Sequence, residues 1–160
     1  MQAVTNVIFA GLGGQGVLKA ADILAHASFH AGLAVKQSEL HGMSQRGGSV
    51  TSDVRLGREV ISPMVPRGEA DYLVVFEEDQ LPLVRAMLRP GGRVIDVSGI
   101  DPARLPVRRS LNIALLGCLS GCLEGIGEAD WQAALVSQLP PDSLDLNRRA
   151  FALGRGAIPA

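Results

Sequence analysis

A glycine-rich turn between an apolar segment and an amphipathic segment constrains the fold of this chain most strongly. Residues 4–10 are almost wholly apolar, and residues 17–31 repeat apolar side chains at every third or fourth position. The first pattern predicts a buried strand, and the second predicts a helix that packs one face on a sheet. A second short strand is expected over 33–38. Together these elements predict one βαβ unit, which is right-handed by default.

The rest of the chain continues the alternation of strands and helices. The apolar run DYLVVFE at 71–77 suits a central parallel strand. The other predicted elements are strands over 49–55 and 93–97, an edge strand over 105–108, and helices over 80–88, 112–123, 129–139 and 144–153. We therefore expect one α/β domain over 1–154, Rossmann-like, with a mostly parallel sheet and helices on both faces. Residues 155–160 are expected to be a loose tail.

Composition excludes several classes of protein. Hydrophobic residues make up 47% of the 160 residues and charged residues only 19%, which excludes intrinsic disorder. The net charge of −1 and the pI of about 6.3 argue against a nucleic-acid binder. No apolar run approaches the ~18 residues of a membrane span, and the N-terminus does not resemble a signal peptide. The sequence therefore predicts a cytoplasmic protein that buries additional surface against a partner.

The turn itself, GLGGQG, matches the spacing G-x-G-x-x-G. In that motif Gly11 makes the turn, Gly13 lets the backbone approach a ligand, and Gly16 lets the helix pack on the strand. The N-terminus of the following helix favours an anion. Gly14 and Gln15 are unusual for a dinucleotide-binding turn. The spacing is compatible with two roles, namely anion binding and tight packing alone.

A second polar segment, ELHGMSQRGG at 39–48, follows the second predicted strand. If both strands are parallel, this segment lies on the same rim of the sheet as the glycine turn. Glu39 is placed to hold a ribose, and the segment supplies varied donors and acceptors, namely His41, Ser44, Gln45, Arg46 and Gly47. The pattern indicates a binding or docking loop, with a solvated loop as the alternative. No nucleophile elbow accompanies Ser44, so His41 is the one candidate for a general acid or base.

Other polar clusters favour structural roles. The acids at 77–79 can bind a metal or a ribose but more often begin a helix, whose dipole they complement. Cys118 and Cys122 lie four residues apart among apolar residues, which favours core packing over a metal or redox site. His26 and His30 have the spacing of zinc ligands but lack the glutamate of the H-E-x-x-H motif. The sequence therefore predicts no metal site.

Four segments of the chain carry a family resemblance. They are GLGGQGVLKAADILA, SELHGMSQRGGSVTSDVRLG, ADYLVVFE and LRPGGRVIDVS. Together they resemble the gamma-type domain of 2-oxoacid:ferredoxin oxidoreductases. The variant HGMSQRGG is most similar to the beta subunit of indolepyruvate:ferredoxin oxidoreductase. The resemblance covers nearly the whole chain and implies a Rossmann-like fold.

The resemblance also implies a place in a larger enzyme. Such enzymes decarboxylate a 2-oxoacid on thiamine diphosphate, pass the electrons through iron-sulfur clusters to ferredoxin, and release an acyl-CoA. Thiamine diphosphate, Mg and the clusters are then held by a large partner subunit, and this chain binds none of them. Residues 11–16 are expected to contact either the CoA pyrophosphate or the partner, and residues 39–47 to form a docking or cleft loop. The isolated chain is expected to be inactive and able to form a homodimer.

Two other classes of function remain open from the sequence alone. A free-standing dinucleotide-binding oxidoreductase would use Gly11, Gly13, Gly16 and Glu39. An ATP-dependent adenylating enzyme also carries a G-x-G-G turn, but this chain is short for that class and lacks its catalytic cysteine.

Overall fold

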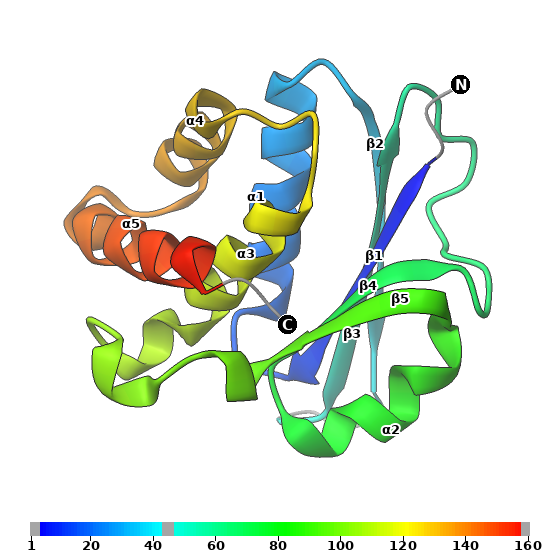
Figure 1. Cartoon of the computed structure of the whole chain (residues 1–160), viewed down its shortest axis with the longest axis horizontal. Helices are drawn as coiled ribbons and strands as arrows, with labels where there is room; N and C mark the ends of the chain where they lie inside the picture. Colours follow the sequence, from blue (N-terminus) through cyan, green and yellow to red (C-terminus); the bar gives the residue numbers. More distant parts are fainter. Residues whose placement is uncertain (1–3, 43–46, 158–160) are drawn as a thin grey trace.

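The computed structural model of the chain describes residues 4–42 and 47–157 (Figure 1). Five strands form one sheet in the order β2-β3-β1-β4-β5. The strands are β1 (Thr5–Leu12), β2 (Ala34–His41), β3 (Ser49–Gly57), β4 (Ala70–Val75) and β5 (Leu88–Asp96). Within the described ranges, no helix is both long enough and apolar enough to cross a membrane.

The sheet is mixed because one strand, β3, runs antiparallel to the others. β1 pairs in parallel with β4, and β4 with β5, whereas β3 is antiparallel to both β1 and β2. Four strands thus run in one direction, which confirms a mostly parallel sheet. β3 returns directly from β2 and inserts between β2 and β1. The βαβ unit is therefore present, but its two strands are not neighbours in the sheet.

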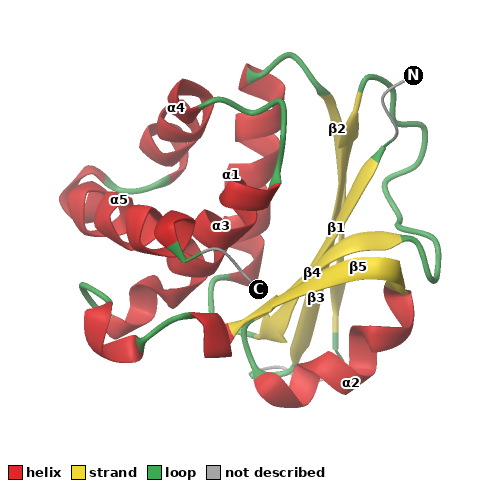
Figure 2. Cartoon of the chain, viewed as in Figure 1, coloured by secondary structure: helices red, strands yellow, loops and turns green. Residues whose placement is uncertain are grey.

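Helices cover the two faces of the sheet unequally (Figure 2). On one face lie α1 (Val17–His30), α3 (Leu111–Cys122), α4 (Glu128–Gln138) and α5 (Pro141–Gly156). In the described part of the chain, α2 (Leu81–Val84) and the connection between β3 and β4 cover the opposite face and close a smaller core. Residues of the larger core come from β1, β3, β4, β5 and all four helices of the first face.

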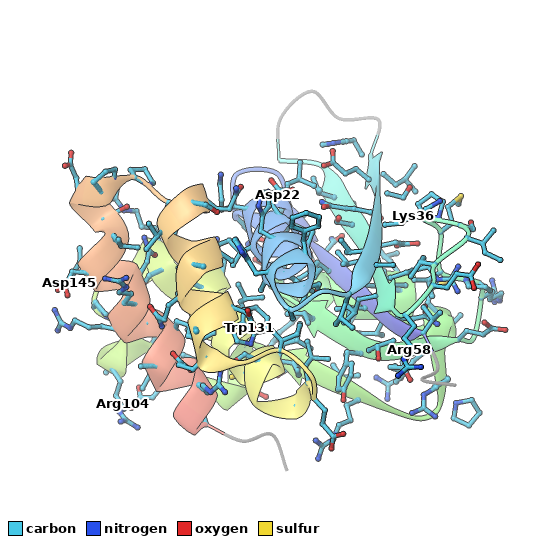
Figure 3. The ribbon with its side chains drawn as sticks, turned by 90° about the horizontal axis from the view of Figure 1, so that it is seen from above. Asp22, Lys36, Arg58, Arg104, Trp131 and Asp145 are labelled. Atoms are coloured by element: carbon cyan, nitrogen blue, oxygen red, sulfur yellow. The ribbon has the colours of Figure 1, made fainter. Side chains whose placement is uncertain are left out.

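The outer helices are held by large apolar contacts. Trp131 of α4 is completely buried, and its ring lies 5.5 Å from that of Phe151 in α5. Figure 3 shows Trp131 among the helices, whereas Lys36 and Arg58 lie on the far side of the molecule. Every residue of α3 from 112 to 120 is buried, so α3 forms the centre of this layer.

Several predicted elements differ in the structure. β5 begins at Leu88, whereas the predicted strand begins at residue 93. The helix expected over 80–88 is a single turn, α2, flanked by 3₁₀ turns, because Pro82 and the start of β5 at Leu88 leave no room for more. The edge strand expected over 105–108 is absent: residues 105–107 lie between two 3₁₀ turns, and Arg108 begins the second of them. The last helix continues past Gly154 to Gly156, so it includes the first residues of the expected tail. Residues 158–160 of that tail lie outside the described residues.

The connection that covers the smaller core is held by a partly buried carboxylate. Asp53 of β3 accepts a hydrogen bond from the Val65 amide at 2.9 Å. Burial raises the pKa of Asp53, and the Val65 amide and Arg55 only partly oppose this effect. The folded state therefore favours the protonated carboxyl, so its contribution to stability is lost as the pH rises from the ordinary pKa of 3.8 through the raised value.

Asp53→Asn should accordingly stabilise the chain at neutral pH. The asparagine oxygen can still accept the Val65 bond, and the cost of burying a charge disappears. We expect a higher melting temperature than wild type at about pH 7, with the difference shrinking toward about pH 4. Glu59→Gln is a suitable control, because Glu59 is exposed in the neighbouring loop. A melting temperature that is lower than wild type at neutral pH would contradict this assignment.

Candidate functional site

The glycine turn joins the carboxyl end of β1 to the start of α1, but its glycines do not act as the motif suggests. Gly11 lies within β1, where a Cβ would be 2.8 Å from Val17 and 3.0 Å from Phe76. Gly16 is the N-cap of α1 with a φ of 78°, and a Cβ there would overlap the side-chain amide of Asn112 in α3. Gly11 therefore permits the packing of strand and helix, and Gly16 permits the approach of α3.

Gly13 packs against the end of the second polar segment, at Gly47 and Gly48. Its amide donates to the carbonyl of Gly48 at 2.9 Å, and a Cβ would lie 3.4 Å from the nitrogen of Gly47. The two polar segments therefore share one rim of the sheet. Because the Gly13 amide is already bonded, it is not available for a phosphate.

The segment expected to be one loop is divided. Glu39 and His41 belong to β2, which extends beyond the predicted boundary, and the exposed His41 ring nitrogen lies 3.7 Å from a carboxylate oxygen of Glu39. His41 lines a pocket of about 400 Å³ with Lys19 on one side of the glycine turn. Glu39, two residues earlier in β2, lines neither of the pockets that contact the turn. Ser44, Gln45 and Arg46 lie outside the described residues.

Gln15 ties the turn to a third strand end. Its side-chain oxygen accepts from the Leu12 amide at 2.8 Å, and its side-chain nitrogen donates to Glu77 at 2.6 Å. Glu77 lies just beyond the end of the short strand β4. Glu78 and Asp79 begin a 3₁₀ turn, as the structural interpretation of the acidic cluster predicts.

On the other side of the turn lies a larger pocket of about 570 Å³. Gly14, Gln15 and Gly16 form one wall, and Arg108 and Arg109 contribute positive charge from the connection before α3. The rest of the lining is Phe76, Leu111 and Asn112. A Cβ on Gly14 would meet nothing within 4 Å, so the backbone there is open to the pocket.

The electrostatics of this pocket favour an anion. The first amides of an α-helix have no partner within the helix, and the helix dipole adds partial positive charge at that end. Arg108 and Arg109 are exposed, and among the described residues neither forms a salt bridge. The first-turn residues 17–19 line the pocket on the His41 side, so the larger pocket meets α1 only at its N-cap, Gly16. A pocket with a glycine backbone and two guanidinium groups can hold a phosphate or pyrophosphate.

A third pocket, of about 400 Å³, shares Arg109 and Asn112 with the pocket of about 570 Å³. It reaches the first turns of α5, where Leu146 gives an apolar surface and Asp142 and Asn147 give polar atoms. The charged pocket thus continues into a mixed one, so there is room for a ligand that is longer than a phosphate group.

Sequence reasoning misses four residues of this region. It places Arg108 in an edge strand, gives Arg109 no role, does not identify Asn112 as a contact of the turn, and does not pair Glu77 with Gln15. The one local signal is the pair of adjacent arginines ahead of an apolar helix. Nothing in the spacing indicates that a segment about 95 residues later packs on the turn.

The cysteines do not form a site of their own among the described residues. Burial raises the pKa of the Cys118 thiol to about 11, so it stays protonated near neutral pH. The thiol of Cys122 lies 3.6 Å from the carbonyl of Cys118 in the preceding turn. Within the described ranges, no three His, Cys, Asp or Glu side chains gather as metal ligands.

Solved structures share this fold. The gamma subunit of keto/oxoacid ferredoxin oxidoreductase from Geobacter sulfurreducens aligns with a TM-score of 0.78 at 22% identity, over 98% of this chain and 97% of that one. The 2-oxoglutarate:ferredoxin oxidoreductase from Magnetococcus marinus, solved with 2-oxoglutarate, coenzyme A and succinyl-CoA bound, aligns with a TM-score of 0.81 at 21% identity. That match covers 98% of this chain but 31% of the longer one, so the same fold occurs there as part of a larger chain.

Sequence comparison gives the family. The indolepyruvate oxidoreductase subunit IorB of Thermococcus kodakarensis is 31% identical over an alignment of 188 positions, gaps included, which covers 93% of both chains. Its counterpart in Pyrococcus horikoshii is 41% identical over 109 residues, 68% of this chain and 52% of that protein. The sequence pattern named pyruvate ferredoxin/flavodoxin oxidoreductase matches residues 6–111, which include both glycine-containing segments. The resemblance seen in the sequence is therefore confirmed, and the chain belongs to the pyruvate ferredoxin/flavodoxin oxidoreductase family.

Proposed function

We propose that this chain is the small subunit of a 2-oxoacid:ferredoxin oxidoreductase that acts on indolepyruvate or another aryl pyruvate. The observation that carries the proposal is the likeness to the T. kodakarensis indolepyruvate oxidoreductase subunit, which extends over 93% of both chains. Subunits of pyruvate/ketoisovalerate and 2-oxoglutarate enzymes are among the more distant relatives, so the class of oxoacid is part of the proposal.

The assembled enzyme would cleave the carboxylate from the oxoacid, transfer an electron pair to ferredoxin, and attach the remaining acyl group to the sulfur of CoA. Thiamine diphosphate supplies the carbanion chemistry in such enzymes. Among the described residues, no three His, Cys, Asp or Glu side chains gather as metal ligands. The family resemblance implies that thiamine diphosphate and the iron-sulfur clusters belong to other domains, and we assign them to a large partner subunit.

The part that this chain plays is the binding of an anion. The pocket formed by Gly14–Gly16, Arg108 and Arg109 suits the phosphate groups of CoA, and the adjoining mixed pocket leaves room for the rest of the molecule. Coenzyme A is a bound ligand of the M. marinus enzyme, whose chain includes the same fold. The chain would thus position a substrate of the complex without taking part in the bond changes.

The alternative function is a free-standing dinucleotide-binding oxidoreductase, which the G-x-G-x-x-G spacing favours. Two observations count against it. The Gly13 amide, which would face a pyrophosphate, is bonded to Gly48, and Glu39 lies outside the pocket where a ribose would sit.

Thermal denaturation with candidate ligands separates the two proposals. CoA at saturating concentration should raise the melting temperature of the purified chain, because a ligand that binds only the folded state stabilises it. NAD and FAD should have no comparable effect. Co-expression with the large thiamine diphosphate subunit should yield a stable complex. A shift with NAD or FAD alone, together with no complex, would instead support the dinucleotide enzyme.

A further inference from the structure

The side chain of Gln15 makes the contacts that join the glycine turn to the rest of the rim. Its oxygen accepts from the Leu12 amide at 2.8 Å, and its nitrogen donates to the carboxylate of Glu77 at 2.6 Å. One amide group therefore connects the end of β1, the turn and the segment that follows β4.

The turn has little stiffness of its own. Gly14 and Gly16 have φ values of 87° and 78°, and glycine reaches such values without favouring them strongly. The space beside Gly11 is filled by the Gln15 oxygen, which would lie 2.9 Å from a Cβ at that position. The side chain of Gln15 thus folds back under the turn, and the missing Cβ of Gly11 makes room for it.

We propose that Gln15, anchored by Glu77, is the positioning residue of the anion pocket. This inference rests on the proposed function, because it concerns how the same pocket is kept ready for its ligand. Gln15 holds the turn so that the Gly14 and Gly16 backbone faces Arg108 and Arg109. It does not need to touch the ligand to do so.

The two roles in the pair are not equivalent. Residue 15 must accept from the Leu12 amide and donate to the Glu77 carboxylate, which the glutamine amide can do and a carboxylate or a thioether cannot. A glutamate at position 15 would place two carboxylates against each other, whereas a glutamine at position 77 could still accept from Gln15. Exchanging the two residues should restore both contacts. The amide at position 77 would then donate to the carboxylate at position 15, which can still accept from Leu12.

The test compares Gln15→Met, Gln15→Glu, Glu77→Gln and the double exchange, with Glu78→Gln as the control. Glu78 is exposed one residue away, and its substitution removes the same charge. The first readout is the hydrogen exchange rate of the Leu12 amide relative to that of Val7 in the middle of β1. The second is the dissociation constant of the chain for CoA.

We expect Gln15→Met and Gln15→Glu to speed Leu12 exchange and weaken CoA binding, each by at least about tenfold, which corresponds to about 1.4 kcal/mol. Glu77→Gln and Glu78→Gln should stay within about threefold of wild type. The double exchange should return Leu12 exchange to nearly the wild-type rate.

Three results would overturn the proposal. The first is an unchanged Leu12 exchange rate in Gln15→Met. The second is a faster exchange and lower melting temperature with unaltered CoA affinity, which would make Gln15 structural only. The third is failure of the double exchange to restore Leu12 protection. If wild type itself does not bind CoA, the proposed ligand is wrong, and the exchange rates alone decide whether Gln15 positions the turn.

Discussion

Gly154→Ala is expected to destabilise the chain by about 3 kcal/mol, which lowers the melting temperature by roughly 10 °C in a domain of this size. A Cβ at Gly154 would overlap the backbone carbonyl of Ala114 in α3. The reverse contact is equally tight, because a Cβ at Gly117 would overlap the carbonyl of Phe151. Backbone cannot move aside as a flexible side chain can, so α3 and α5 must separate.

Gly156→Ala provides the matched control in the same helix. A Cβ there would meet nothing within 4 Å. Because alanine favours a helix over glycine by up to about 1 kcal/mol, this variant should melt at or slightly above the wild-type temperature. The measurement is thermal or urea denaturation of both variants. Equal stability of Gly154→Ala and wild type would show that the two helices do not cross as closely as described.

The second large effect is expected from the double variant Arg108→Ala with Arg109→Ala. Both guanidinium groups line the pocket but are exposed, so each contact with a phosphate is worth about 1 kcal/mol at most. Losing both should raise the dissociation constant for CoA by up to about 30-fold. The loss should be smaller at high salt, because screening already weakens these contacts in the wild-type protein.

A control for net charge is available elsewhere on the surface. Arg58 and Arg85 are exposed and lie outside that pocket. Replacing both by alanine removes the same charge, so it should leave CoA affinity within about threefold of wild type. Isothermal titration calorimetry on the two double variants gives the comparison. An equal loss of CoA affinity in the two double variants would mean that net charge alone causes the effect, and it would contradict the assignment of the pocket.

Local patterns in the sequence are enough to predict most elements and their meeting point. The apolar run before Gly11 and the spacing after Gly16 correctly predict β1 and α1, since both depend on neighbours along the chain. The expectation that the turn and the segment after the second strand share one rim agrees with the Gly13–Gly48 hydrogen bond. It follows from strand direction alone.

Contacts between distant segments cannot be predicted in this way. A glycine near the end of an apolar helical pattern ordinarily marks a helix end, yet Gly154 lies inside α5, because α3 requires the absence of a side chain there. In the same way, position 16 must be glycine because the side chain of Asn112 occupies the space of a Cβ. Arg108 reaches the pocket only because α3 packs beside α1. The antiparallel insertion of β3 between β2 and β1 also depends on the pairing of strands and not on their local composition.

The rate of ferredoxin reduction with indolepyruvate and CoA, measured while the large thiamine diphosphate subunit is titrated with this chain, tests the account most directly. We predict no activity from either component alone. The rate should then rise with added chain until the two are present in equal amounts, and remain constant beyond that ratio. Turnover by this chain alone, or a large subunit that is fully active without it, would contradict the assignment of this chain as a required small subunit.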